Sequence, residues 1–181
     1  MTRMYKKTVC WSLFFFLATC GSLHAQDASP KKIQSCRTFV QGFYNWYLRG
    51  HFIEDVIKYR SNALNAELLR LLKDSMPKGD DEGFVWDWDP FLAGNDPGTR
   101  YSVGRITRKG DTLWVGVHHV LPPPRPAKPD VTAEVMFKDG RWFFVNFHYA
   151  KDPKLPMNDN LLSILKWYKS HRTPTKREGR L

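Results

Sequence analysis

The chain has 181 residues, 42% hydrophobic and 25% charged, and these proportions exclude a long disordered polymer and leave room for one ordinary domain and a targeting segment. Its 26 aromatic residues favour a compact core, since each ring can bury roughly 150–250 Å². The net charge of +10 belongs to the two ends, because the body from residue 26 to 165 carries 19 basic and 17 acidic residues, which argues against a nucleic-acid-binding domain.

Residues 1–25 have the pattern of a secretory signal peptide. A basic start, with Arg3, Lys6 and Lys7, precedes an apolar stretch from Val9 to Ala18 and ends at Ala25. A membrane-spanning helix needs about 20 apolar residues, so a cleaved signal fits better than a retained span. The sequence therefore predicts an exported protein, in the periplasm or cell envelope of a bacterium, that starts at residue 26.

The cysteines leave one alternative open. Leu17 to Gly21 resembles a bacterial lipobox, in which Cys20 would carry a lipid and attach the chain to a membrane. Thr19 is an unfavourable residue just before that cysteine, so cleavage after Ala25 is preferred. After that cleavage only Cys36 remains, and we expect it to be a small buried residue on the first helix, not a nucleophile.

Two helical stripes come next. Ser29 before Pro30 is a favourable helix start, and apolar residues then recur every three or four positions until Gly50. A second stripe, rich in leucine from Leu64 to Leu72, predicts a shorter helix or a broken pair that ends at Pro77.

An irregular connection from Lys78 to Arg100 follows the helices, and loops of this length are uncommon unless they are functional. Three of its carboxylates, Asp87, Asp89 and Asp96, lie within ten residues of loop, and calcium accepts such ligands. Their spacing matches no established calcium loop, and an aspartate before proline commonly opens a turn. We favour a structural role and predict no metal site, and keep Asp89 and Asp96 as candidates for ligand binding.

Residues 101–149 form two predicted hairpins, and the turn is clearest in the second. Tyr101 to Arg108 and Thr112 to Leu121 flank a turn at Gly110, and Val131 to Lys138 and Arg141 to Tyr149 flank Asp139-Gly140, a typical two-residue turn. Counting outward from that turn predicts one face made of four cross-strand pairs: Phe137 with Trp142, Val135 with Phe144, Ala133 with Asn146, and Val131 with His148. The other face would pair Met136 with Phe143, Glu134 with Val145, and Thr132 with Phe147.

The histidines are the candidates for acid/base chemistry. His118 and His119 are adjacent on a strand, so they point to opposite faces and cannot chelate one metal together. His119 or His148 could act as a general base in an open cone, although a histidine on an apolar face is more often only hydrogen-bonded. With Asn146 and Trp142 they complete the candidate ligand-binding residues, and no catalytic residue or cofactor is predicted.

Residues 121–129, between the two hairpins, are rich in proline and should form an extended connector. The chain ends with a C-terminal segment at 151–181. In this segment Leu161, Ile164, Leu165 and Tyr168 have helical spacing, and six basic residues against one acid follow from Lys166 onward. We expect the basic tail to be a solvated end, and binding to phosphate, acidic lipid or cell wall is the alternative.

The order of these pieces resembles a family of exported bacterial proteins, the domain of unknown function 3828, between Phe39 and Tyr149. The resemblance is carried by Phe43-Tyr44-Asn45-Trp46-Tyr47-Leu48, Asp89-Pro90-Phe91, Asn95-Asp96, Tyr101-Ser102-Val103, Val115-Gly116-Val117 and Asp139-Gly140-Arg141-Trp142. It implies a cone-like fold of the nuclear-transport-factor-2 or cystatin type and transfers no catalytic residue.

The sequence thus predicts one α+β domain at 26–150, with N-terminal helices packed on a curved antiparallel sheet of about four strands, and a C-terminal helix. The preferred function is a non-enzymatic envelope module that binds a small molecule or an envelope protein. The alternative is a cofactor-independent hydratase or isomerase that uses the cone cavity, and the third is a periplasmic inhibitor of a toxin.

Overall fold

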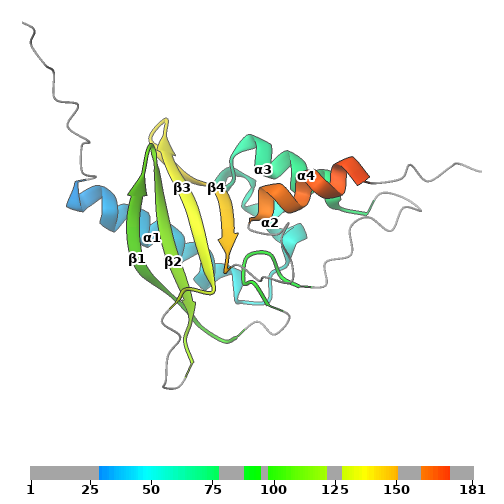
Figure 1. The fold of residues 1–181 in the computed structure, drawn as a ribbon. Coiled ribbons are helices and arrows are strands. Elements are labelled where there is room, and N and C mark those ends of the chain that lie inside the picture. The colour runs from blue at the N-terminus through cyan, green and yellow to red at the C-terminus, as the bar shows by residue number, and fades with distance from the viewer. Residues whose placement is uncertain (1–28, 78–87, 95–97, 122–127, 151–159, 172–181) are drawn as a thin grey trace, which may run out of the picture.

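The computed structural model describes residues 29–77, 88–94, 98–121, 128–150 and 160–171 (Figure 1). The signal segment, Cys20, Asp87, Asp96, residues 122–127 and the tail after His171 lie outside the described residues. The elements are α1 (Pro30–Tyr47), α2 (Ile53–Tyr59), the short 3-10 helix η1 (Ser61–Ala63), α3 (Ala66–Ser75), β1 (Tyr101–Lys109), β2 (Thr112–His119), β3 (Val131–Lys138), β4 (Arg141–Tyr149) and α4 (Leu161–His171). The class is α+β, as the sequence predicts.

The four strands form one antiparallel sheet in the order β1-β2-β3-β4. The sheet curves around α1, which lies against one of its faces, and α3 and α4 lie side by side beyond β4 (Figure 1). Asp139 and Gly140 both have positive φ values, 52° and 75°, so the predicted two-residue turn between β3 and β4 is confirmed.

The helices begin and end largely where the sequence predicts. Ser29 caps α1 by accepting a hydrogen bond from the Lys32 amide, and the apolar stripe of α1, Cys36 included, is buried. Cys36 is buried, as the sequence predicts, and burial raises the pKa of its thiol to about 12. The second stripe is the broken pair, α2 and α3, and Asn65 starts α3 by accepting a hydrogen bond from the Leu68 amide at 2.7 Å.

The predicted register of the second hairpin is correct near the turn and wrong farther out. Phe137 pairs with Trp142, Met136 with Phe143 and Val135 with Phe144, but Val145 is then an extra residue in a β-bulge. Beyond it Glu134 pairs with Asn146, Thr132 with His148, Ala133 with Phe147 and Val131 with Tyr149, instead of the predicted partners.

The physical reason for this correction lies in the core. Phe144 and Phe147 are both fully buried although three positions apart, a spacing that strict alternation would send to opposite faces. The bulge turns Phe147 toward the core. The next residue, His148, therefore lies on the face of Thr132, opposite the face that carries Trp142 and Phe144.

One edge of the sheet, β1, is covered by side chains of α1. Arg37 donates hydrogen bonds to the carbonyls of Val103 and Gly104 at 2.6 and 2.9 Å. The amide of Gln41 donates to the Tyr101 carbonyl and accepts from the Val103 amide, both at 3.0 Å. Edge groups that would otherwise invite another strand are therefore satisfied within the chain.

The opposite edge, β4, is covered by segments far away in the sequence. Leu64 forms a parallel bridge with Phe144, and the Asn65 amide donates to the Phe144 carbonyl at 2.9 Å. His148 forms a bridge with Asn160 just before α4.

Among the described helices, none has both the length and the apolar content needed to cross a bilayer.

Candidate functional site

Asp89 is the centre of a polar cluster on the inner side of the sheet, which faces α1. Its Oδ1 accepts hydrogen bonds from the Phe91 and Leu92 amides at 2.8 and 3.1 Å, and its Oδ2 accepts one from the Tyr47 hydroxyl at 2.6 Å. Burial raises the pKa of the Asp89 carboxyl above its ordinary value, and these hydrogen bonds offset only part of that rise. The aspartate opens a turn and bonds its own backbone, as the sequence predicts.

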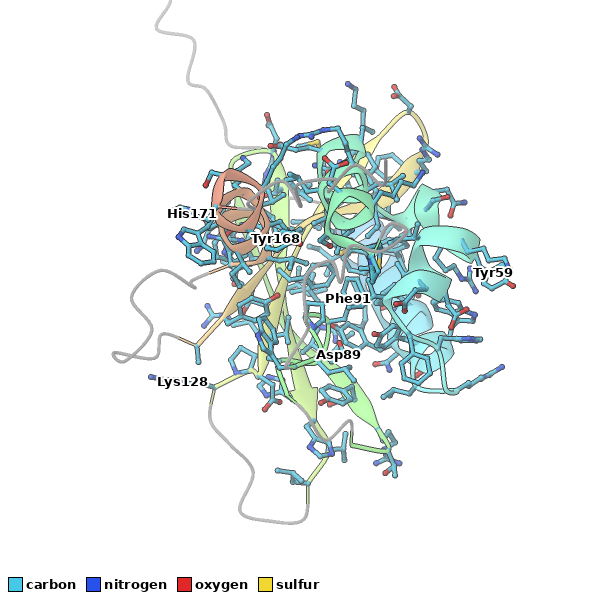
Figure 2. All side chains as sticks on the ribbon, turned by 90° about the vertical axis from the view of Figure 1, so that its right-hand side faces the viewer. Tyr59, Asp89, Phe91, Lys128, Tyr168 and His171 are labelled. Carbon is cyan, nitrogen blue, oxygen red and sulfur yellow. The ribbon has the colours of Figure 1, made fainter. Side chains whose placement is uncertain are left out.

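Three further tyrosines hold the same turn. Tyr44 donates to the Phe91 carbonyl and Tyr149 to the Pro90 carbonyl, both at 2.8 Å, and the Tyr101 hydroxyl lies 3.5 Å from the Leu92 carbonyl. Phe91 is fully buried at the middle of the molecule, next to Asp89 (Figure 2), with edge-to-face contacts to Phe43, Tyr47 and Phe147. Each of these polar groups has a partner inside the protein, so the Asp89 cluster anchors residues 89–92 to the core.

His119 lies on the inner side at the end of an aromatic stack. Its ring stacks on Tyr101 with centroids 5.1 Å apart, and Tyr101 stacks on Tyr44 at 5.8 Å. The backbone of Gly98 passes directly over the His119 ring, where any side chain would collide with it. This is a packed, half-buried histidine, in keeping with the structural alternative for this residue.

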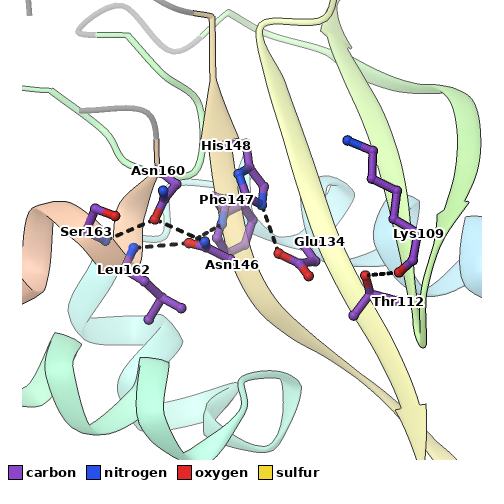
Figure 3. Close-up of polar contacts among 9 residues, drawn as sticks. All are labelled: Lys109, Thr112, Glu134, Asn146, Phe147, His148, Asn160, Leu162 and Ser163. Atoms are coloured by element: carbon purple, nitrogen blue, oxygen red, sulfur yellow. Dashed lines mark hydrogen bonds and ion pairs between the residues drawn. The ribbon is translucent and has the colours of Figure 1, made fainter. Parts of the chain in front are cut away.

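Two other candidate residues make hydrogen bonds within the fold. The Trp142 indole is buried and donates to the Ser35 hydroxyl at 2.9 Å, which ties the hairpin to α1. Asn146 accepts from the Leu162 amide at 3.0 Å and donates to the side chain of Asn160 at 3.1 Å (Figure 3). Asn146 therefore positions the start of α4, a role that its place on a strand does not reveal.

His148 belongs to a different cluster, on the outer face of the sheet. This face, turned away from α1, has no helix drawn over β2 and β3 in Figure 1. The His148 ring stacks on Trp114 with centroids 4.0 Å apart, and its Nε2 lies 2.8 Å from Oε2 of Glu134 (Figure 3). Lys109 places its ammonium 3.3 Å from the centre of the Trp114 ring. We call these four residues the open-face cluster.

The strand register extends this cluster toward the turns of the two hairpins. Trp114 lies opposite Glu134, and the next row along the sheet contains Lys109, Thr112, Met136 and Phe143. Lys138 and Arg141 form the row after that, and both are exposed. Three cations therefore lie at one end of a face whose middle is aromatic, and no ion pair joins them to an acid among the residues that the structure describes.

The open-face cluster can act in two chemical ways. Its cations and rings can hold an anionic, partly apolar group, because cation–π contacts and aromatic surface favour such ligands. His148 and Glu134 can also pass a proton, because a carboxylate that accepts from one imidazole nitrogen leaves the other nitrogen as an acceptor. Their side chains are only 19% and 18% exposed, so the pair is shielded but reachable.

Sequence reasoning included His148 but missed its partners. Alternation along β2 correctly separates Trp114 and His118 from the buried Val115 and Val117. An uninterrupted register predicts Glu134 on the face opposite His148, and a β-bulge has no simple signature in a single sequence. The odd spacing of the two aromatic residues Phe144 and Phe147 was the available signal.

No cluster of three or more metal-ligating side chains occurs within the described residues. No family model matches the chain, and no similar curated protein or solved structure was found. The resemblance to the domain of unknown function 3828 therefore stays a prediction.

Proposed function

We propose that this protein is a non-enzymatic binding module of the bacterial cell envelope, exported through its N-terminal signal segment. Its binding site is the open-face cluster, and its ligand carries an anionic group. The observation that supports this most directly is the stack of Lys109, Trp114 and His148, with Glu134 beside it, on a sheet face over which Figure 1 draws no helix at β2 and β3.

The charge around the stack supports an anionic ligand. Glu134 lies close enough to balance a positive charge on His148, whereas Lys109, Lys138 and Arg141 have no ion pair among the described residues. A ligand anion beside them would gain charge-assisted hydrogen bonds, which are stronger than neutral ones. Trp114 adds a half-buried aromatic surface next to these cations.

Within the described residues, the inner side of the sheet offers no comparable site. The hydroxyls and the carboxylate around Asp89 already bond to one another or to backbone groups. Recruiting them for a ligand would break buried hydrogen bonds, each of which costs about 1–3 kcal/mol when one partner is left unpaired. This contrast favours the outer face.

The test is capture of ligand from envelope extract by the purified protein, with bound molecules identified by native mass spectrometry. We expect capture by the unchanged protein and a loss of at least about tenfold in Trp114→Ala, equal to about 1.4 kcal/mol. Tyr59→Ala is the matched control, because Tyr59 is an exposed aromatic residue on α2, and it should capture normally. Equal capture by Trp114→Ala would contradict the proposal.

A hydratase or isomerase is the second candidate function, and the contact between His148 and Glu134 is the observation that favours it. That pair is the acid/base couple such an enzyme needs, although it lies on the outer face and not in a cone cavity. Turnover of the captured molecule that is lost in His148→Gln and kept in His171→Gln would favour catalysis over simple binding. His171 is a suitable control because it is exposed on α4.

A further inference from the structure

The open-face cluster lies on a strip of sheet whose two ends differ in charge. Both hairpin turns lie at one end of the sheet (Figure 1), and there Lys109, Lys138 and Arg141 are exposed. Glu134, beside His148, lies farther along β3, about 13 Å from the position of Lys138 at the rise of an extended strand. The strip therefore has cations at the turn end and a carboxylate toward the other end.

The cations at the turn end are open to an external anion. Residues 108–111 and 138–141 contain four Lys or Arg residues against two aspartates, so this end has a positive balance. Among the described residues, no ion pair joins Lys109, Lys138 or Arg141 to an acid. An anion that binds here therefore displaces no carboxylate among the described residues.

Next to these cations the strip is apolar. Met136 and Phe143 face each other on β3 and β4, in the row before Lys138 and Arg141, and both are half-buried. Methionine is flexible, so its thioether adapts to apolar ligands of irregular shape. An apolar ligand that covers this row removes it from water, which favours binding.

The surroundings of Trp114 decide what shape of apolar ligand fits. The Lys109 ammonium lies 3.3 Å from the centre of the Trp114 ring, and the His148 ring stacks on it with centroids 4.0 Å apart. Two groups this close to the centre of one ring would collide on a single face, so they occupy opposite faces. The indole therefore has no free face on which a planar ligand could stack, and only its edge adjoins the strip.

We infer that the ligand of the open-face cluster is a single-chain alkyl carboxylate, of the fatty-acid class. This inference rests on the proposed function and names the class of its ligand. The carboxylate lies between Lys138 and Arg141, and a guanidinium can hold it with two parallel hydrogen bonds. The chain lies across Met136 and Phe143, which a flexible ligand can follow closely. Repulsion from Glu134 keeps the anionic group at the turn end.

The experiment is isothermal titration calorimetry of the full chain with decanoate, below the concentration at which decanoate forms micelles. Decanol has the same chain without the charge, and acetate has the charge without the chain. We expect decanoate to bind at one site, decanol to bind at least about tenfold more weakly, and acetate to show no saturable binding. From hexanoate to decanoate, each added methylene should tighten binding by about twofold, since an open face removes only part of each methylene from water.

A pair of charge variants tests the turn end. Lys138→Ala with Arg141→Ala should weaken decanoate binding by at least about tenfold, because both charge-assisted contacts are lost. Lys31→Ala with Arg49→Ala is the matched control. It removes one Lys and one Arg at exposed positions near the two ends of α1, and it should bind decanoate within about twofold of the unchanged chain.

A second pair of variants tests the apolar row. Phe143→Thr keeps a residue that favours strands and should weaken decanoate binding by about three- to tenfold. Phe137→Thr is the matched control, because Phe137 belongs to the same hairpin but lies on the opposite face, where its ring contacts Trp142. It should bind decanoate normally. Met136→Thr tests the same row from β3, and urea denaturation establishes that each variant is folded.

Three outcomes would overturn the inference. The first is decanol that binds as tightly as decanoate, and the second is equal weakening by the two pairs of charge variants. The third is naphthoate, a planar acid, that binds more tightly than decanoate and loses its affinity in Trp114→Ala, which would assign the strip to planar ligands.

Failure of the proposed function gives a different result. If a molecule is captured from envelope extract in a way that depends on Trp114, but decanoate does not bind, the binding function stands and the alkyl class is wrong. If decanoate binds as described, but extract gives no capture that depends on Trp114, the ligand chemistry of the strip stands and the role as an envelope binding module is wrong.

Discussion

The two faces of the sheet use aromatic and polar side chains in opposite ways. On the inner face, beneath α1, the polar atoms of the tyrosines and of Asp89 form hydrogen bonds with one another and with the backbone of a single turn. On the outer face, Lys109, Trp114 and His148 stack in partial contact with solvent. A cluster of aromatic and polar side chains can therefore anchor the fold or form a binding site. Its burial, and the hydrogen-bonding capacity that its polar groups still have open, distinguish the two cases.

The largest effect is expected from Phe91→Ala. Phe91 is fully buried and touches the rings of Phe43, Tyr47 and Phe147 on the inner face. Its loss should lower the free energy of unfolding by about 3–5 kcal/mol, because a cavity remains where the ring was. Urea denaturation followed by circular dichroism measures this, and a loss below about 1 kcal/mol would mean that the turn is not anchored as described.

Tyr44→Phe should have the next largest effect. The Tyr44 hydroxyl is buried and bonds to the Phe91 carbonyl, so its removal leaves that carbonyl without its partner. We expect a loss of about 1–3 kcal/mol in the free energy of unfolding, again from urea denaturation. Tyr59→Phe is the control, with less than about 0.5 kcal/mol expected, because Tyr59 is 58% exposed.

Asp89→Asn should alter the pH dependence of stability. Since the pKa of the folded Asp89 carboxyl is raised above its unfolded value of 3.8, the folded state binds the proton more tightly. The stability that Asp89 contributes is therefore fully present below the unfolded pKa and declines as pH rises through the folded pKa.

Unfolding in urea at a series of pH values from about 3 to 8 tests this sign. At the acid end, the free energy of unfolding of the unchanged protein should exceed that of Asp89→Asn by about 1 kcal/mol. This difference should shrink as the pH rises. A difference that instead grows with pH would show that the hydrogen bonds to the carboxylate outweigh its burial.

Glu134→Gln on the outer face should have the smallest effect on stability. The contact with His148 is partly solvated, and such pairs contribute about 0–1 kcal/mol, so we expect a loss of about 0.5 kcal/mol or less. The same urea measurement applies. A loss comparable with that of Tyr44→Phe would remove the distinction between the two faces and assign the open-face cluster to the core.

Local patterns predicted most of the elements. The Asp139-Gly140 turn, the capping serine at position 29 and the alternation along β2 each act over a few residues, and the structure confirms all three. The buried stripe of α1 was equally clear, since a helical period depends only on neighbouring turns of one helix.

The candidate site was predicted only in part. Asp89 was identified as a turn opener, and His148 as a residue that could do chemistry. The partners of both come from other elements: Tyr47 from α1 for the one, Trp114 and Glu134 from β2 and β3 for the other. Pairings of this kind depend on where distant segments meet, and periodicity carries no information about that.

Short-range sterics and the spacing of apolar residues are enough to predict the helices, the strands, the tight turn and the α+β class. The tertiary structure decided which face His148 occupies. Burying both Phe144 and Phe147 in the core required an extra residue in β4, and that single bulge placed His148 on the outer face beside Glu134 and Trp114. Packing of the core, acting across the whole sheet, thus chose the composition of the site.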